Sequence, residues 1–353
     1  MPHERQPIRG RGAASNPTNR FELIHYERDA TAPEEDSPAP ATRFYRDRSR
    51  SILAHNDSPD VGFETSVNPY RGCEHACAYC YARPTHEYLG FSAGLDFETK
   101  IMVKEDAPVL LRKELASAKW RPRLVAISGV TDPYQPVERR LGLTRRCLEV
   151  FAEFRNPVGV VTKNHLIGRD VDLLAELARH RAAAAFLSIT TLDAELARRM
   201  EPRASSPSGR LAAIEELTRA GVPVGVLTAP VIPGLTDHEL PAILAAAAKA
   251  GACCAAYVLL RLPHGVGPLF EEWLGQHYPD RRDKVLSRLR EMRGGAISDA
   301  RFGSRMRGQG VLAEQIAALF RLGCRRAGLD TQFPTLSTAA FRRPGGTQKL
   351  LFE

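Results

Sequence analysis

The sequence contains no uninterrupted apolar stretch of 18 or more residues, the length that a helix needs to cross a bilayer. Residues 1–17 also lack the apolar run of a secretory signal. We therefore expect neither a membrane span nor export, and we expect a cytoplasmic location.

Cysteines are few and unevenly placed. The chain has 7, and three of them, Cys73, Cys77 and Cys80, fall within eight residues. The disulfide framework of a small secreted domain distributes its cysteines along the chain instead. Reduced thiols that bind a metal are therefore the better interpretation of this group.

Aromatic residues are also scarce, at 7%, and no aromatic-rich binding motif accompanies the basic charge of the chain. That charge is concentrated: residues 281–353 carry 15 lysines and arginines against 6 acidic residues, a net +9, within a total of +8. A basic segment attracts phosphate backbones, so nucleic acid is one candidate partner. A solvated arginine-rich surface with ordinary ion pairs is the alternative.

The composition changes along the chain and predicts three regions. Residues 1–58 are rich in proline and charged residues, without apolar periodicity, and predict an N-terminal extension that is largely disordered or draped over the domain. Residues 59–265 alternate short β-branched runs with longer helical stretches, which is typical of βα units. Residues 266–353 predict a helical, basic C-terminal extension, with helices near 281–293 and 311–327.

Six candidate strands follow from the apolar runs of the central region. They are residues 62–67, 124–128, 158–162, 185–190, 222–229 and 255–260. The helical stretches between them are long enough for the crossovers that parallel neighbours require. We therefore predict an α/β fold, a (β/α)6 partial TIM barrel, with an open doubly wound sheet as the alternative.

The three clustered cysteines lie just after the first predicted strand, where parallel α/β folds collect their reactive groups. Three thiolates on one loop can each bind a different iron of a cubane cluster and leave one iron open for chemistry. A zinc site completed by His75 or His86 is an alternative, and so are three buried thiols without a metal.

The motif Cys73-x3-Cys77-Ala-Tyr79-Cys80 resembles the signature of the radical S-adenosylmethionine (SAM) superfamily. The Thr-Lys163-Asn run and Leu-Ser188-Ile are similar to the spore photoproduct lyase branch, whose members are often labelled DNA repair photolyases, over residues 60–265. The resemblance implies a partial TIM barrel and a [4Fe-4S] cluster. It also implies cleavage of S-adenosyl-L-methionine to a 5′-deoxyadenosyl radical that abstracts a hydrogen atom.

The resemblance further implies roles for individual residues. Cys73, Cys77 and Cys80 would ligate the cluster, while Lys163 would pair with the carboxylate of the methionine moiety. Ser188 would hydrogen-bond the methionine or the ribose, and Tyr79 and Tyr81 would pack along the cofactor. An external electron donor of the flavodoxin or ferredoxin type is the implied partner.

Two other features carry less information. Ser128, before Gly129, is expected at the edge that receives the methionine amino group, and Asp132 would bind that amine, unless Asp132 and the following proline form a plain turn. For Glu201 and Arg203 we expect surface ion pairs. No catalytic residue emerges from the sequence.

The chain departs from the branch that it resembles in one respect. Spore photoproduct lyase returns a hydrogen atom to its substrate from a cysteine near the end of the second strand, whereas residues 126–130 contain no thiol here. The substrate therefore stays open. The alternative from another functional class is a non-catalytic iron–sulfur or zinc protein that binds nucleic acid as a sensor; a structural βα scaffold with incidental cysteines is a third.

Overall fold

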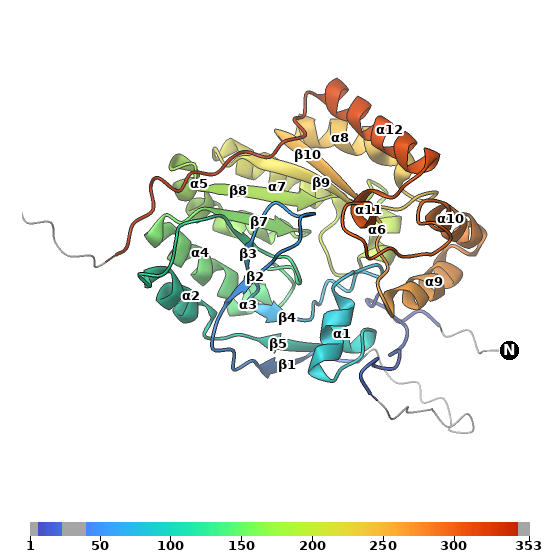
Figure 1. The fold of residues 1–353 in the computed structure, drawn as a ribbon, viewed down its shortest axis with the longest axis horizontal. Coiled ribbons are helices and arrows are strands. Elements are labelled where there is room, and N and C mark those ends of the chain that lie inside the picture. Colours follow the sequence, from blue (N-terminus) through green and yellow to red (C-terminus); the bar gives the residue numbers. More distant parts are fainter. Residues whose placement is uncertain (1–5, 23–39, 345–353) are drawn as a thin grey trace, which may run out of the picture.

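The computed structural model describes residues 6–22 and 40–344, and its main sheet has seven strands in the order β10-β9-β8-β7-β6-β3-β2 (Figure 1). The strands are β2 (Leu53–His55), β3 (Thr65–Val67), β6 (Val125–Ile127), β7 (Val158–Thr162), β8 (Ala183–Ser188), β9 (Val224–Val231) and β10 (Cys254–Leu259). All neighbours are parallel except the edge pair β2 and β3. The six predicted strands are thus confirmed, with small shifts at their ends.

The strand order distinguishes the two predicted architectures. From β3 to β10 the parallel strands follow one another in chain order, so every crossover steps in the same direction. A doubly wound sheet reverses direction at a switch point, whereas a barrel does not. Since β2 and β10 are the end strands of the sheet and do not pair with each other, the sheet is a partial barrel, as predicted.

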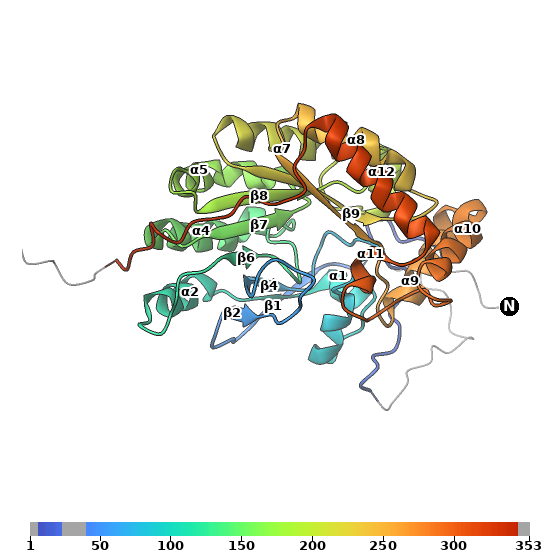
Figure 2. The same cartoon turned by 45° about the horizontal axis from the view of Figure 1, so that its top comes forward.

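Helices cover the outer side of the curved sheet (Figure 2). They are α2 (Ala107–Ala116), α4 (Leu143–Phe154), α5 (Val171–Arg179), α7 (Pro207–Arg219) and α8 (Leu240–Lys249), with α6 (Ala194–Met200) preceding α7. Local sequence sets the start of α7. The Ser206 hydroxyl accepts a hydrogen bond from the Gly209 N–H, and Pro207 occupies the first helical position. The inner and outer faces of the strands are both buried, which explains their continuous apolar sequences.

A second, three-stranded sheet of order β1-β5-β4 was not predicted. It comprises β1 (Arg43–Arg46), β4 (Tyr70–Arg71) and β5 (Lys100–Val103), with α1 (Leu95–Thr99) and the 3-10 helix η1 (Arg83–Leu89) beside it (Figure 1). All four residues of β1 are exposed, and β4 has two residues. Neither strand therefore carries an apolar pattern that sequence analysis can detect.

The described part of the N-terminal extension is draped over the domain. The backbone N–H groups of Gly12 and Ala13 donate to the carboxylate of Glu98, at 3.2 and 2.9 Å. A Cβ atom at Gly12 would lie 1.9 Å from the carbonyl oxygen of Ala76, so only glycine fits against the cysteine loop here. Residues 1–5 and 23–39 of the predicted extension lie outside the described residues.

The C-terminal region is helical as predicted and then crosses the far side of the barrel. It contains α9 (Val266–His277), α10 (Pro279–Glu291), α11 (Ser304–Arg307) and α12 (Val311–Ala327), which packs along α8. The chain then passes the amino ends of the strands: the Ser337 N–H donates to the Arg181 carbonyl, and the Arg342 N–H to that of Phe154. The tail thus lies opposite the strand ends that carry the cysteine loop. Residues 345–353 lie outside the described part.

Short helical segments complete the fold: α3 (Glu138–Leu141), η2 (His165–Asp170) and η3 (Asp237–Glu239). Across residues 6–22 and 40–344, every helix is too short or too polar to span a bilayer.

Candidate functional site

A cavity of about 600 Å³ opens at the carboxyl ends of the main-sheet strands. Its lining includes all nine residues to which the sequence assigned cluster or cofactor binding, namely Cys73, Cys77, Tyr79, Cys80, Tyr81, Ser128, Asp132, Lys163 and Ser188. They come from the loops after β4, β6 and β7 and from the last residue of β8. The barrel therefore assembles the predicted residues into one site, although they span more than a hundred positions of sequence.

The cysteine loop is fixed by a buried arginine that the sequence analysis did not identify. Arg83 donates to the carbonyl of Cys77 from Nε and Nη2, at 3.1 and 2.8 Å, and its Nη2 pairs with Glu98 at 2.5 Å. Both side chains of this ion pair are fully buried. A guanidinium with several fixed donors suits the task of holding backbone carbonyls in place.

A second brace connects the loop to the segment after β6. The side-chain oxygen of Gln135 accepts the Glu74 N–H at 2.9 Å, and its amide donates to the Gly72 carbonyl at 3.2 Å. Gly72 has φ +78°, and a Cβ atom there would lie 2.9 Å from the carbonyl oxygen of Phe97. The turn into Cys73 therefore requires glycine.

The three thiols line the same cavity and are the kind of ligand that iron–sulfur clusters use. Burial raises the pKa of Cys73, Cys77 and Cys80. The carboxylates of Asp132 and Glu201 raise the pKa of Cys73 and of Cys77 further, and neighbouring thiols add to this. Without a cation the loop would therefore hold protonated thiols, whereas bound iron supplies the positive charge that stabilises thiolates.

The histidines of the zinc alternative are engaged elsewhere. His75 contacts the Asp132 carboxylate through Nδ1 and the Asn164 side chain through Nε2, and His86 Nε2 contacts the carbonyl of Lys100 at 2.9 Å. Within the described ranges, no three His, Cys, Asp or Glu side chains are grouped to hold a single metal ion. His86 Nδ1 is buried without a partner in the described part of the chain, but His86 lies outside the cavity lining, so the structure does not bring this histidine and the cysteines together around one metal ion.

Asp132 braces the site. One carboxylate oxygen accepts hydrogen bonds from the Thr162 hydroxyl and the Tyr134 N–H, and the other from the Lys163 N–H and His75. Burial would raise the pKa of Asp132, but His75 and these hydrogen bonds lower it to about 2. A carboxylate offers about four acceptor positions, and protein groups occupy those of Asp132. The turn at Asp132 and its connection to the end of β7 therefore both depend on this side chain.

Glu201 and its partners lie beneath the cavity. The expectation of a surface ion pair is wrong for Glu201, which is 2% exposed and pairs with the fully buried Arg210. Glu201 also accepts hydrogen bonds from the hydroxyls of Tyr79 and Thr190. Helical periodicity could not reveal this burial, since Glu201 directly follows the last residue of α6 and turns inward there.

Lys163 differs from these residues because its ammonium group has no carboxylate within 4.0 Å in the described part of the chain. Its Nζ lies 5.9 Å from the centroid of the Tyr79 ring, at the edge of the cavity. Arg203, in contrast, pairs with Glu74 at 3.1 Å. The unpaired Lys163 is therefore a cation available to an anionic group of a bound molecule.

The segment after β6 forms the rim. Ser128 has φ +147° and Gly129 φ +103°, and the Tyr81 hydroxyl donates to the Gly129 carbonyl at 2.7 Å. A positive φ at a non-glycine residue is costly and often found at functional sites. Tyr81, which is 48% exposed, thereby connects the cysteine loop to this rim.

The remaining cysteines lie away from the cavity lining. Cys147, Cys254 and Cys324 are buried in the core, and Cys253 is exposed near the start of β10. Among the described residues, Cys73, Cys77 and Cys80 are therefore the only thiols in the cavity lining.

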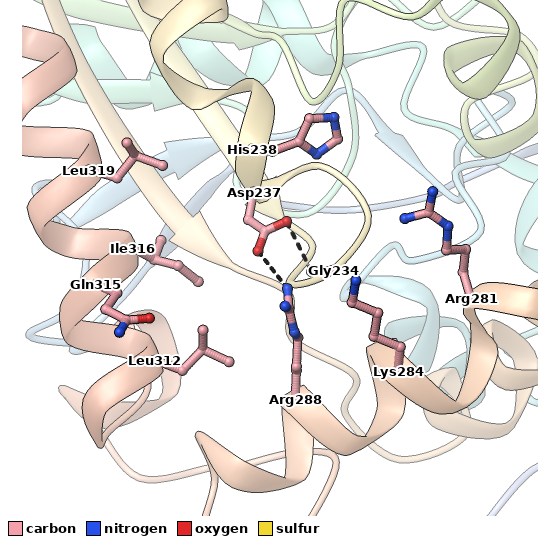
Figure 3. Close-up of a pocket in the computed structure, with 10 residues that line it drawn as sticks. All are labelled: Gly234, Asp237, His238, Arg281, Lys284, Arg288, Leu312, Gln315, Ile316 and Leu319. Atoms are coloured by element: carbon pink, nitrogen blue, oxygen red, sulfur yellow. Dashed lines mark hydrogen bonds and ion pairs between the residues drawn. The ribbon is translucent and has the colours of Figure 1, made fainter.

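A second cavity, of about 560 Å³, lies between α10, α12 and the loop after β9 (Figure 3). Arg281, Lys284 and Arg288 project from α10 along one side, and Leu312 and Ile316 of α12 line the other. Arg288 pairs with Asp237 at 3.1 Å, whereas Arg281 and Lys284 have no carboxylate within 4.0 Å among residues 6–22 and 40–344. The surface therefore keeps two unneutralised positive charges.

Comparison with protein families gives a direct match. Residues 67–247 match the model described as the radical SAM superfamily. An uncharacterized protein of Mycobacterium tuberculosis is 39% identical over 232 residues, which cover 65% of this chain and 67% of that protein. A protein of Pseudomonas phage M6 named radical SAM Nalpha-GlyT isomerase is 24% identical over 57% of this chain and 40% of its own length.

Solved structures of spore photoproduct lyase share the fold. One of them, a mutant with bound AdoMet and dinucleoside spore photoproduct, has a TM-score of 0.58 and 18% identity, and covers 83% of this chain and 82% of its own. Another, complexed with the dinucleoside spore photoproduct, has a TM-score of 0.58 and 17% identity over the same shares.

Proposed function

Because the chain belongs to the radical SAM superfamily, we propose that Cys73, Cys77 and Cys80 hold a [4Fe-4S] cluster and that the protein abstracts a hydrogen atom from a nucleic-acid substrate. The cluster and SAM together supply the 5′-deoxyadenosyl radical of the family's chemistry. The observation that carries the proposal is the single cavity that brings the three cysteines together with Lys163 and Ser188.

The side chains around the cavity would bind and orient SAM. Lys163 is the group that we assign to the methionine carboxylate, because its ammonium has no carboxylate partner of its own in the described structure. Ser188 lies at the end of β8 in the same lining, and its carbonyl is held by Arg210 at 2.9 Å. Tyr79 is fixed by Glu201 and offers an apolar wall.

Several contacts keep these groups in place before anything binds. The braces through Arg83, Gln135 and Asp132 hold the cysteine loop, and the buried Glu201 and Arg210 hold the end of β8. A reactive radical requires such fixed groups around it, since misplaced substrates quench it. The reductant would be an external electron donor of the flavodoxin or ferredoxin type.

Nucleic acid is the substrate class that we propose, for two reasons. Arg281 and Lys284 leave unneutralised positive charge on α10, and phosphate backbones are attracted to such surfaces. In addition, structures with this fold were solved with a dinucleoside photoproduct, although they are 17–18% identical to this chain. A base acted on at a barrel mouth would have to leave its stack.

We do not assign repair of the spore photoproduct. Residues 126–130, at the end of the second predicted strand, contain no thiol, whereas the lyase branch has a cysteine in this region. The described cavity lining holds no thiol besides Cys73, Cys77 and Cys80. We therefore propose that the substrate radical is not quenched by a hydrogen atom from a cysteine at this position, as it is in spore photoproduct lyase.

Isotope transfer tests the substrate class. The reconstituted protein, SAM and a reductant are incubated with uniformly deuterated DNA or RNA, and 5′-deoxyadenosine is analysed by mass spectrometry. We expect deuterium in the 5′-deoxyadenosine with one of the two. If 5′-deoxyadenosine forms but stays unlabelled with both, nucleic acid is not the substrate. If SAM binds but is never cleaved, the sensor alternative is favoured.

A further inference from the structure

Arg261 is a second unpaired cation in the cavity. It follows β10 and lines the cavity near Tyr81, whose ring centroid lies 5.3 Å from its guanidinium carbon. Within the described ranges no carboxylate lies within 4.0 Å of it, and its Nη1 donates only a weak hydrogen bond to the Met306 sulfur at 3.6 Å. A half-buried guanidinium with most of its five N–H groups unused has capacity for an anion.

The neighbouring Arg305, in contrast to Arg261, has a carboxylate partner and a further hydrogen bond. Its Nε pairs with Asp60 at 2.5 Å, and its Nη2 donates to the Ser58 hydroxyl at 2.5 Å. Asp60 also accepts a hydrogen bond from the Gly303 N–H, so both of its carboxylate oxygens bind residues 303–305. Burial and the nearby positive charge of Arg305 lower the pKa of Arg261, while Tyr81 and Asp60 oppose this effect.

A third arginine, Arg293, fixes the backbone at Arg305 and at Leu260, the residue before Arg261. Arg293, which is 4% exposed, donates from Nη2 to the carbonyl of Leu260, at 2.6 Å, and from Nη1 to the carbonyl of Arg305, at 3.2 Å. The backbone on either side of the unpaired guanidinium is therefore fixed before a ligand arrives. Such preorganisation reduces the entropic cost of binding.

We propose that Arg261 binds a phosphodiester group of the substrate at the cavity mouth. This inference rests on the proposed function, since it assigns the anion to a nucleic-acid strand. The methionine carboxylate has Lys163 and Ser188 on the loops after β7 and β8, so the arginine after β10 is left for another anion. The planar fork of a guanidinium matches two phosphate oxygens, and Tyr81 beside it is 48% exposed and could stack with an adjacent base.

The test compares two dinucleotides that differ in one charge. Binding of thymidylyl-3′,5′-thymidine and of its neutral methylphosphonate analogue is measured by calorimetry on the reconstituted full chain with SAM present. We expect the wild type to prefer the charged form by about 10- to 100-fold, the range for a charge-assisted hydrogen bond. Arg261→Gln should lose this preference, and Arg261→Lys should keep part of it. Arg290→Gln, which removes an exposed charge from α10, should leave it intact.

Three outcomes would overturn the inference: no preference or no binding in the wild type, an unchanged preference in Arg261→Gln, or a loss of SAM affinity in that variant instead. Unchanged SAM affinity in Arg261→Gln also shows that the variant is folded. SAM cleavage is followed in the same preparations. Failure of cleavage with a retained charge preference would contradict the proposed function and leave the phosphodiester site standing.

Discussion

Arg83 donates two hydrogen bonds to the carbonyl of Cys77, the central residue of the cysteine loop. Its charge is balanced by Glu98, and both side chains are fully buried. Because Glu98 also accepts the N–H groups of Gly12 and Ala13, one buried ion pair connects the N-terminal segment to the candidate cluster ligands. The loop geometry thus depends on an interaction that is fixed outside the cavity.

Replacing this arginine should damage both the fold and the cluster. Arg83→Met leaves Glu98 as an unpaired buried charge, so we expect a loss of about 3–5 kcal/mol in the free energy of unfolding and a lower iron content. Arg112→Met is the control, because its pair with Glu153 is exposed and worth less than about 1 kcal/mol. Denaturant titration and iron and sulfide assays measure both effects. Equal stability of the two variants would contradict the role of Arg83.

Lys163→Met should separate cofactor binding from cluster assembly. The side chain binds no carboxylate within 4.0 Å in the described structure, so its loss should leave iron content unchanged while SAM binds about 10- to 100-fold more weakly, the range for a charged hydrogen bond. Lys119→Met removes an exposed lysine as the control. Equilibrium binding of SAM to the reconstituted variants is the measurement, and wild-type affinity in Lys163→Met would refute the assignment.

Glu201 predicts a pH dependence of stability. Burial opposes its ionisation, but Arg210 and Lys163 outweigh this and lower the pKa of Glu201 in the folded protein. A lowered folded pKa stabilises the fold above the unfolded value of about 4.3, and the contribution disappears as the pH falls through the folded pKa. The wild type should therefore exceed Glu201→Gln in free energy of unfolding at pH 6, and the gap should shrink towards pH 3. A gap that is independent of pH would show that Glu201 is not ionised.

The cations of α10 should determine the salt dependence of nucleic-acid binding. Arg281→Gln combined with Lys284→Gln should reduce the slope of log affinity against log salt by about two, one for each phosphate that the helix no longer neutralises. Arg325→Gln with Arg326→Gln removes the same charge from the exposed end of α12. Fluorescence anisotropy with a labelled oligonucleotide gives both slopes. If the two pairs have the same effect, the surface in Figure 3 has no special role.

The sequence predicted the parallel strands and the cavity lining well, because both leave local patterns. Strand β7 is predicted to the residue, since a strand buried on both faces is a short apolar run bounded by turns. Cys73, Cys77 and Cys80 are recognisable from their spacing alone. The exposed strand β1 has no such pattern and was missed.

The residues that support the site could not be predicted in the same way. Arg83, Gln135 and Arg210 are single polar residues whose partners lie 5 to 63 positions away, and nothing in their local sequence distinguishes them from surface residues. Glu201 was assigned to the surface for the same reason. Arg261 had one detectable signal, because it directly follows the last predicted strand, at the barrel end where reactive groups collect.

The most direct measurement is anaerobic reconstitution with iron and sulfide, reduction with dithionite and chromatography for 5′-deoxyadenosine after SAM is added. We expect 5′-deoxyadenosine from the wild type and from Cys147→Ala, whose cysteine is buried outside the cavity, and none from Cys77→Ala. Cleavage that persists in Cys77→Ala, or a wild-type protein that assembles no cluster and retains only zinc, would contradict the assignment of these three cysteines to a radical SAM site.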